Sequence, residues 1–383
     1  MRKILTSVVA LVLTVATLFT FASCHKQNAV VATYKEDSVT SGLYLLFLVN
    51  ADNNARALVD EQNAENADFD AQTANYYKMD VTIEAENEDE EDTKVNFKQY
   101  VKQKAEESLK QYFYVKQLAD EKKITLTKEE EDEAKSLANY YWAYYGYAGI
   151  YEPNAISYES YETYIVRQQL NFKIFKELYK VGGEKGVTEK KLKTEFEKNY
   201  LIANTVAVGL TKTDDQGNAV DMTDKEKKQE KQKLENYAEK INKGEVKFKD
   251  VYELYNGKVE QGSTVEDDQP KPKDMYATVY GAEGTSATNE NYETIKKLYS
   301  KKGAGYAQVI ENKDAKQYLL VVTADITKDD YYYDTYLDDL TNLLYNDEYT
   351  EQTKQDSEKI EVEYNKYELN YLKPEKISYE MVG

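Results

Sequence analysis

The spacing of apolar residues along the chain changes twice, and this change constrains the fold more than any single motif. In the first half, apolar residues recur at the interval of one helix face, as in Phe97, Val101, Ala105, Leu109 and Phe113. The segment Leu201–Leu210 is instead short and rich in β-branched residues. The helical interval returns near Asp329. The sequence therefore predicts an α+β fold, with a small α+β block at 201–326 inserted into a discontinuous helical domain formed by 29–200 and 327–383.

Local signals place several elements within these blocks. Thr127–Glu130 and Thr223–Glu226 have the spacing of a capping box, so we expect a helix to begin at each. Two β-like runs, Tyr306–Ile310 and Tyr318–Thr323, are typical of a closing hairpin. A further helix is expected from about Asp329 to Tyr349, so the strands should lie between two helical parts.

The N-terminus has the layout of an export signal. Residues 1–23 begin with two basic residues, continue as an apolar run and end in small residues. The next residue is Cys24, and the segment Phe21–Cys24 resembles a bacterial lipobox. We expect 1–23 to be removed, Cys24 to carry the lipid, and 24–28 to act as a tether. The protein would then be extracytoplasmic and anchored to the bacterial cell membrane as a lipoprotein. The alternatives are an ordinary signal peptide or an uncleaved anchor helix.

Charge and composition exclude several functional classes. The 70 acidic and 50 basic side chains give a net charge of −20, which disfavours binding to nucleic acid. The only histidine is His25 and the only cysteine is Cys24, so hydrolases that need an imidazole and zinc sites built on several Cys or His are excluded. The acidic run Glu84–Asp92 lacks the spacing of a calcium-binding loop. We therefore expect no metal and no cofactor.

Tyrosine is the dominant aromatic residue, with 37 tyrosines against one tryptophan. The densest cluster lies in Asn139–Tyr151, and a tyrosine ring offers broad apolar contact with a polar tip and little rotamer entropy to lose. The rings either replace Leu and Phe in the core and at its edges, or form a binding surface for unfolded polypeptide or glycan. The candidate peptide-binding residues are Tyr140, Tyr141, Trp142, Tyr144, Tyr145 and Tyr147.

Four segments, in this order along the chain, resemble the foldase lipoproteins of the PrsA type and the related SurA-like chaperones. Val30–Leu45 resembles the opening turn and first helix of that family, and Leu118–Glu131 its linker between helices. Val187–Tyr200 resembles the short helix that enters the parvulin domain, and Leu369–Ile377 the C-terminal strand and tail. The resemblance implies a helical chaperone domain built from both chain ends around a parvulin-type peptidyl-prolyl isomerase domain.

At the isomerase site, the sequence differs from the pattern of that family. Parvulin domains usually have one histidine in the first strand and one in the last, and this chain has Thr205 and Tyr318 at the expected positions. The resemblance thus implies a chaperone that holds exported unfolded or nascent polypeptides, with an inactive parvulin-like domain and no catalytic residues. The alternatives are an active isomerase with a histidine-free site, and a cell-surface lipoprotein that binds solutes or glycans.

Overall fold

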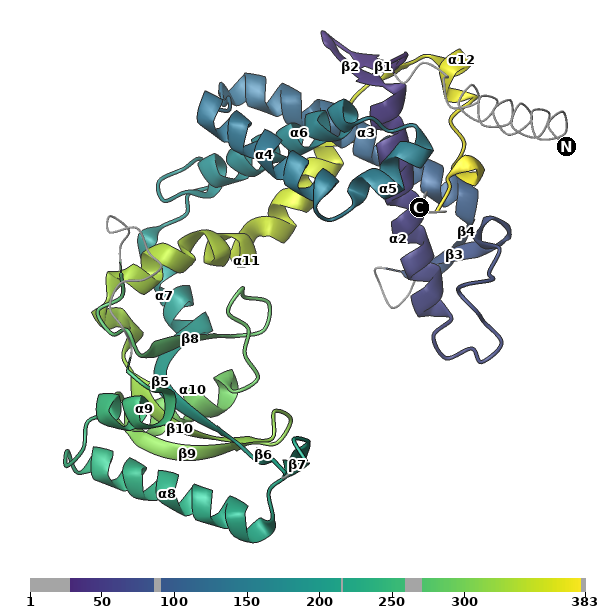
Figure 1. The fold of residues 1–383 in the computed structure, drawn as a ribbon. Helices are drawn as coiled ribbons and strands as arrows, with labels where there is room; N and C mark the ends of the chain where they lie inside the picture. Colours follow the sequence, from purple (N-terminus) through teal and green to yellow (C-terminus); the bar gives the residue numbers. More distant parts are fainter. Residues whose placement is uncertain (1–27, 86–90, 215, 259–270, 380–383) are drawn as a thin grey trace, which may run out of the picture. The chain divides into compact units, whose positions relative to one another are not determined.

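The computed structural model describes residues 28–379 except 86–90, 215 and 259–270 (Figure 1). The predicted signal segment, Cys24 and the middle of the acidic run at 84–92 lie outside the described residues. The chain divides into two compact units, called here unit 1 (residues 1–177 and 347–383) and unit 2 (residues 178–346). The fold is mixed α+β, as predicted.

Unit 1 opens on a three-stranded antiparallel sheet and continues as helices. β1 (Val30–Tyr34) and β2 (Asp37–Thr40) form a hairpin, and β11 (Glu363–Tyr364) pairs with the other side of β1. The other elements of unit 1 are α2 (Ser41–Gln62), η1 (Tyr76–Lys78), the hairpin β3 (Asp80–Ile83) and β4 (Thr93–Asn96), α3 (Phe97–Lys122), α4 (Lys128–Ala143), α5 (Tyr147–Tyr151), η2 (Glu152–Asn154), most of α6 (Tyr158–Tyr179), α12 (Lys366–Leu369) and η4 (Pro374–Lys376).

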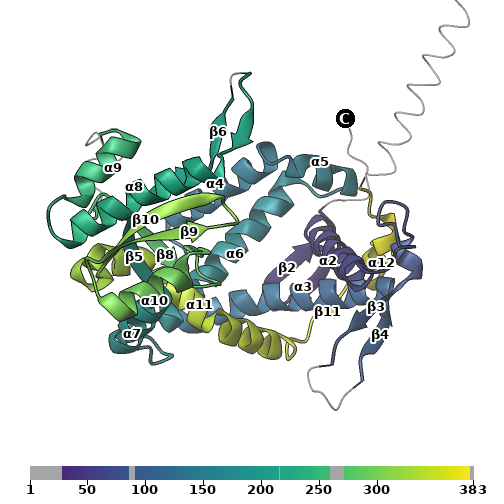
Figure 2. The ribbon, with the colours of Figure 1, turned by 90° about the horizontal axis from the view of Figure 1, so that it is seen from below.

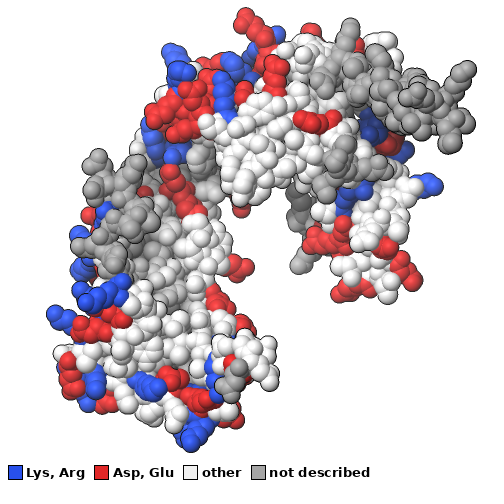
Figure 3. Space-filling model, viewed as in Figure 1, with Lys and Arg blue, Asp and Glu red and all other residues white. Residues whose placement is uncertain are grey.

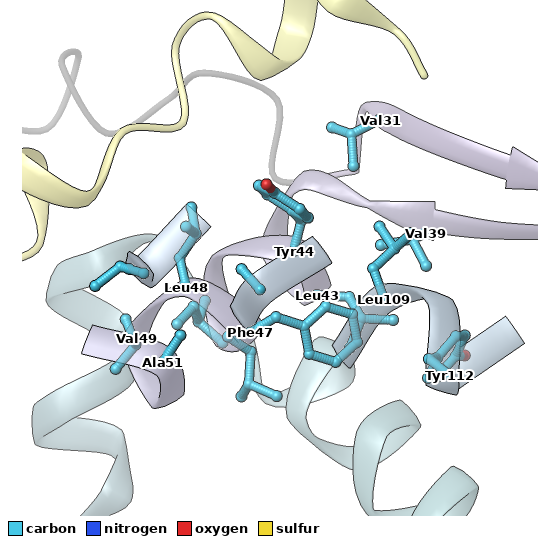
Figure 4. Packing of buried hydrophobic residues seen from close by; sticks show 14 of the residues in the cluster. Val31, Val39, Leu43, Tyr44, Phe47, Leu48, Val49, Ala51, Leu109 and Tyr112 are labelled. Carbon is cyan, nitrogen blue, oxygen red and sulfur yellow. The ribbon is translucent and has the colours of Figure 1, made fainter. Parts of the chain in front are cut away.

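The core of unit 1 lies between α2 and α3. The predicted stripe of α3 is confirmed, because its five apolar residues are all buried. α2 contributes Leu43, Phe47 and Leu48 to this core, and Figure 4 shows Leu43 and Phe47 beside Leu109 of α3. Fully burying one such side chain contributes about 1.5–3 kcal/mol, so this contact accounts for much of the hydrophobic stabilisation of unit 1.

Unit 2 is built on a four-stranded antiparallel sheet with the order β8-β5-β10-β9. α8 and α9 cover one face of this sheet and α10 covers the other, and Figure 2 shows α8 and α10 on opposite sides. The elements are α7 (Glu189–Asn199), β5 (Tyr200–Gly209), the hairpin β6 (Thr211–Thr213) and β7 (Ala219–Asp221), α8 (Asp224–Asn242), α9 (Phe248–Asn256), β8 (Ala277–Gly281), α10 (Tyr292–Lys302), β9 (Ala307–Asn312), β10 (Gln317–Ala324), η3 (Ile326–Lys328) and most of α11 (Asp330–Ser357).

Both capping boxes and the closing hairpin β9–β10 are confirmed. The predicted insert covers 201–326, whereas the compact unit covers 178–346. The difference follows from ring contacts: Phe196 of α7 stacks on Tyr200 at the start of β5, and Tyr200 also contacts Tyr336 of α11. α7 and the first part of α11 therefore belong with the sheet.

The resemblance predicted a C-terminal strand within Leu369–Ile377, and this prediction is wrong. The strand of that region is β11 at Glu363–Tyr364, and α12 follows it at once. The chain leaves the sheet because the side chain of Asn365 accepts a hydrogen bond from the Glu368 amide and thereby caps α12.

Candidate functional site

The tyrosine-rich segment of unit 1 forms a helix end, a turn and a short helix. α4 ends at Ala143, and Gly146 then adopts a left-handed conformation (φ 73°) that a residue with a side chain rarely adopts. α5 begins directly after it, at Tyr147. The segment 139–151 contains no charged residue, and Figure 3 shows uncharged surface over this end of α4 and over α5. The turn therefore presents aromatic rings on a neutral surface of an acidic protein.

Three of these rings are solvent-exposed and contact one another. The exposed fractions are 74% for Tyr144, 58% for Tyr145 and 48% for Tyr140. Tyr140 and Tyr144 are stacked, with ring centroids 5.1 Å apart and planes 10° apart. Tyr145 lies edge-on to both, at 5.4 Å from Tyr140 and 5.6 Å from Tyr144. We call these three residues the tyrosine surface.

The tyrosine surface continues into the core through half-buried rings. Tyr141 contacts Tyr145 at 5.4 Å and stacks on Tyr147 at 5.8 Å. Tyr147 in turn lies edge-on to Tyr151 and Tyr161, both of which are buried. Each exposed ring contacts another ring of the segment, and these contacts restrict its orientation.

Trp142 does not belong to this exposed set. It is only 9% exposed and lies among Tyr151, Tyr158 and Tyr161, with ring centroids 5.6–6.0 Å away. Trp142, one of the predicted peptide-binding residues, is therefore not exposed together with Tyr140, Tyr144 and Tyr145. Trp142 lies two residues after Tyr140 and two residues before Tyr144, the C-cap residue of α4. A separation of two residues places side chains on opposite sides of a helix, so Trp142 points inward while Tyr140 and Tyr144 point outward.

The groups at this site are aromatic rings and phenol hydroxyls. Burial raises the pKa of Tyr151 to about 12, so its hydroxyl stays protonated at physiological pH and donates to the Asn50 side chain at 3.2 Å. Along the described part of the chain, no group of three or more His, Cys, Asp or Glu residues is arranged to hold a metal ion. Aromatic contact and hydroxyl hydrogen bonding are what this surface offers.

The two positions aligned with parvulin histidines lie on opposite faces of the sheet of unit 2. Thr205 pairs with Val321, and Val321 is in the cluster under α10. Tyr318 pairs with Val208 and lies in the cluster under α8 and α9. The structure therefore does not bring Thr205 and Tyr318 together.

Neither position carries an imidazole. Thr205 is half-buried and its hydroxyl accepts a hydrogen bond from Tyr280 at 3.1 Å. The residues of β10 on either side of Tyr318 are Gln317 and Leu319, and both lie on the face of Thr205 because side chains alternate along a strand. Leu319 is buried in the cluster under α10. Moving the alignment by one residue thus brings leucine or glutamine, not histidine, to this face.

Comparison with known proteins adds no relative. No family model matches the chain, and no curated protein matches it. Within the described ranges, no helix is both long enough and apolar enough to cross a membrane.

Proposed function

We propose that this protein is a lipid-anchored extracytoplasmic chaperone that holds exported polypeptides before they fold. The observation that carries the proposal is the tyrosine surface, whose three exposed rings contact one another and continue through Tyr141 and Tyr147 into the aromatic core of unit 1. The anchor rests on the sequence pattern at Cys24, and the compartment rests on the segment before it.

The physics of the tyrosine surface suits weak and reversible holding. An unfolded chain exposes apolar and aromatic side chains, which gain free energy when they contact the rings of Tyr144 and Tyr145. The rings lose little entropy on binding because their neighbours already fix them. Since an unfolded client is bound and a folded one is not, the free concentration of aggregation-prone chains falls by mass action.

Unit 2 has the place in the chain that the parvulin resemblance implies, between two helical parts. In this proposal it is a spacer or a second contact for the client. The face that holds Thr205 is closed by α10 through Tyr292, Ile295 and Leu298. With no histidine between residues 178 and 346, we expect no efficient prolyl isomerisation.

The test is a paired assay on the soluble chain that starts after Cys24. We expect it to suppress aggregation of reduced, unfolded lysozyme without accelerating isomerisation of a prolyl peptide. The variant Tyr144→Ser/Tyr145→Ser should need roughly tenfold more protein for half-maximal suppression, because two aromatic contacts worth about 1.5 kcal/mol together are lost.

The matched control is Tyr367→Ser/Tyr371→Ser. These two tyrosines are also exposed and in ring contact, at 5.4 Å, but lie in the α12 region of unit 1. Equal loss of suppression in both variants would contradict the assignment to the tyrosine surface. Failure of the unmodified chain to suppress aggregation would overturn the chaperone proposal, and clear isomerisation would favour the alternative of a histidine-free isomerase.

A further inference from the structure

Unit 1 contains a cavity of about 600 Å³ that the proposed function does not use. It lies between α2, α3 and α6, with α5 and the end of α11 at its margin. Phe47 of α2 and Tyr112 of α3 belong to its wall and are labelled in Figure 4. The volume is within the range of pockets that enclose a small organic ligand.

The wall of this cavity is rich in side-chain amides. Four of them have no hydrogen-bond partner among the described residues: Asn53, Asn54 and Gln168, which are exposed to solvent, and Gln111, which is half-buried. Each amide group can both donate and accept hydrogen bonds. A ligand that covers these groups displaces their water, and a polar ligand can replace the lost hydrogen bonds whereas an apolar one cannot. The cavity therefore selects a polar ligand.

The cavity is also electrically neutral. None of the described residues that line it is Asp or Glu, although acidic residues are 70 of the 383 in the chain. Its one cation, Arg167, is compensated by Asp37, whose carboxylate accepts from both terminal guanidinium nitrogens at 3.0 Å. The same guanidinium donates to the Tyr112 carbonyl at 2.7 Å and lies 3.9 Å from the centre of the Tyr112 ring. No uncompensated charge remains to bind an ionic ligand.

Aromatic faces complete the wall. Tyr147, Tyr151 and Tyr164 line the cavity beside Phe47, and Phe47 lies 6.2 Å from Tyr164 in an edge arrangement. Flat rings of this kind bind the C–H face of a sugar ring, while amide forks bind its hydroxyls. The amides come from three different helices, which fits a compact ring better than an extended peptide, whose backbone needs partners in a row.

We propose that this cavity binds one or two residues of a neutral saccharide. Gln111 and Gln168 approach from different helices and bind hydroxyls, and Tyr147 and Tyr164 contact the ring faces. The inference does not depend on the chaperone proposal, because the cavity does not contain Tyr140, Tyr144 or Tyr145.

The test is calorimetric titration of the full chain, in a detergent without a sugar headgroup, with chitotriose, maltotriose and cellotriose. A capped neutral hexapeptide of alanine and serine is titrated in parallel. We expect at least one trisaccharide to bind with a Kd below about 1 mM. Gln168→Ala and Gln111→Ala should each weaken that binding about tenfold, since each removes a donor and an acceptor.

The matched control is Gln169→Ala, which removes the neighbouring amide on α6 that does not line the cavity. It should leave the Kd within about twofold. Tyr144→Ser/Tyr145→Ser should leave it unchanged as well, which separates this site from the tyrosine surface. Thermal melts of each variant confirm that unit 1 is folded.

Two results would overturn the proposal. One is that none of the three trisaccharides gives binding heat at concentrations up to about 10 mM. The binding free energy would then be less favourable than about −3 kcal/mol. The other is binding of the capped hexapeptide that is lost in Gln168→Ala, because the cavity would then be a site for polypeptide backbone.

Discussion

The most informative stability prediction concerns Asp52, a fully buried carboxylate on α2. One of its oxygens accepts from the Arg56 Nε at 2.6 Å and from the Tyr379 hydroxyl at 2.7 Å. Burial opposes the charge on Arg56, but the hydrogen bond and charge of Asp52 raise the pKa of Arg56 above its ordinary value. In Asp52→Ala the guanidinium therefore stays charged and loses its partner.

The magnitude follows from burial. Removing one member of a buried pair costs about 3–5 kcal/mol, and we expect the lower end, about 3 kcal/mol, because the Arg56 side chain keeps 24% of its surface exposed. Tyr76 and Tyr379 lie 4.4 and 4.5 Å from the guanidinium and limit its access to water. At about 2–3 kcal/mol per molar urea, the unfolding midpoint should fall by about 1–1.5 M.

The assay is urea unfolding followed by fluorescence of Trp142, the single tryptophan, which reports on unit 1. The control is Asp120→Ala, which breaks an exposed i,i+4 pair with Lys116 on α3 and should change the free energy of unfolding by less than about 0.5 kcal/mol. Adding Arg56→Ala to Asp52→Ala should recover part of the loss. A loss below about 1 kcal/mol for Asp52→Ala would refute the reasoning.

Three further predictions follow from single contacts. Burial raises the pKa of Tyr151 and of Tyr349 to about 12. The stability that these two side chains contribute is therefore fully present below pH 10 and is lost as the pH rises towards 12. In an alkaline titration, the tyrosinate absorbance at 295 nm should rise in two steps, and the second step should coincide with unfolding. Thr223→Ala removes the cap of α8 and should lower the stability of unit 2 by about 1 kcal/mol in thermal unfolding, and an unchanged melting curve would contradict this. Tyr379→Phe removes one hydrogen bond to Asp52 and should cost about 1–2 kcal/mol by urea unfolding, less than Asp52→Ala.

Local signals in the sequence predicted the helices well. The stripe from Phe97 to Phe113 and the capping box at Thr127 depend on residues within one or two turns, and both are confirmed. Elements that depend on distant partners were not predicted. β8 has a weak strand pattern, and its position follows from pairing with β5, in which Tyr280 lies opposite Leu201, about 80 residues earlier.

The candidate site shows the same division. The sequence located the tyrosine cluster, and its i,i+4 spacing already excluded burial of all rings in one seam. It did not show that Trp142 faces inward and Tyr144 outward, because that depends on which side of α4 meets the core. The cavity amides gave no signal, because Asn54, Gln111 and Gln168 lie on three separate helices and only the fold brings them to one cavity.

The pairing of β1 with β11 bears on the order in which the protein is made. Asn365 donates to the Val30 carbonyl across 335 residues, so one edge of β1 lacks its partner until nearly the whole chain has been synthesised. At roughly 5–20 residues per second this interval is about 15–70 seconds. Unit 2 is continuous in sequence and can complete its sheet before unit 1 does. For that interval the unfinished unit 1 exposes a strand edge and apolar helix faces, so the protein must itself pass through the kind of aggregation-prone state that we propose it holds in others.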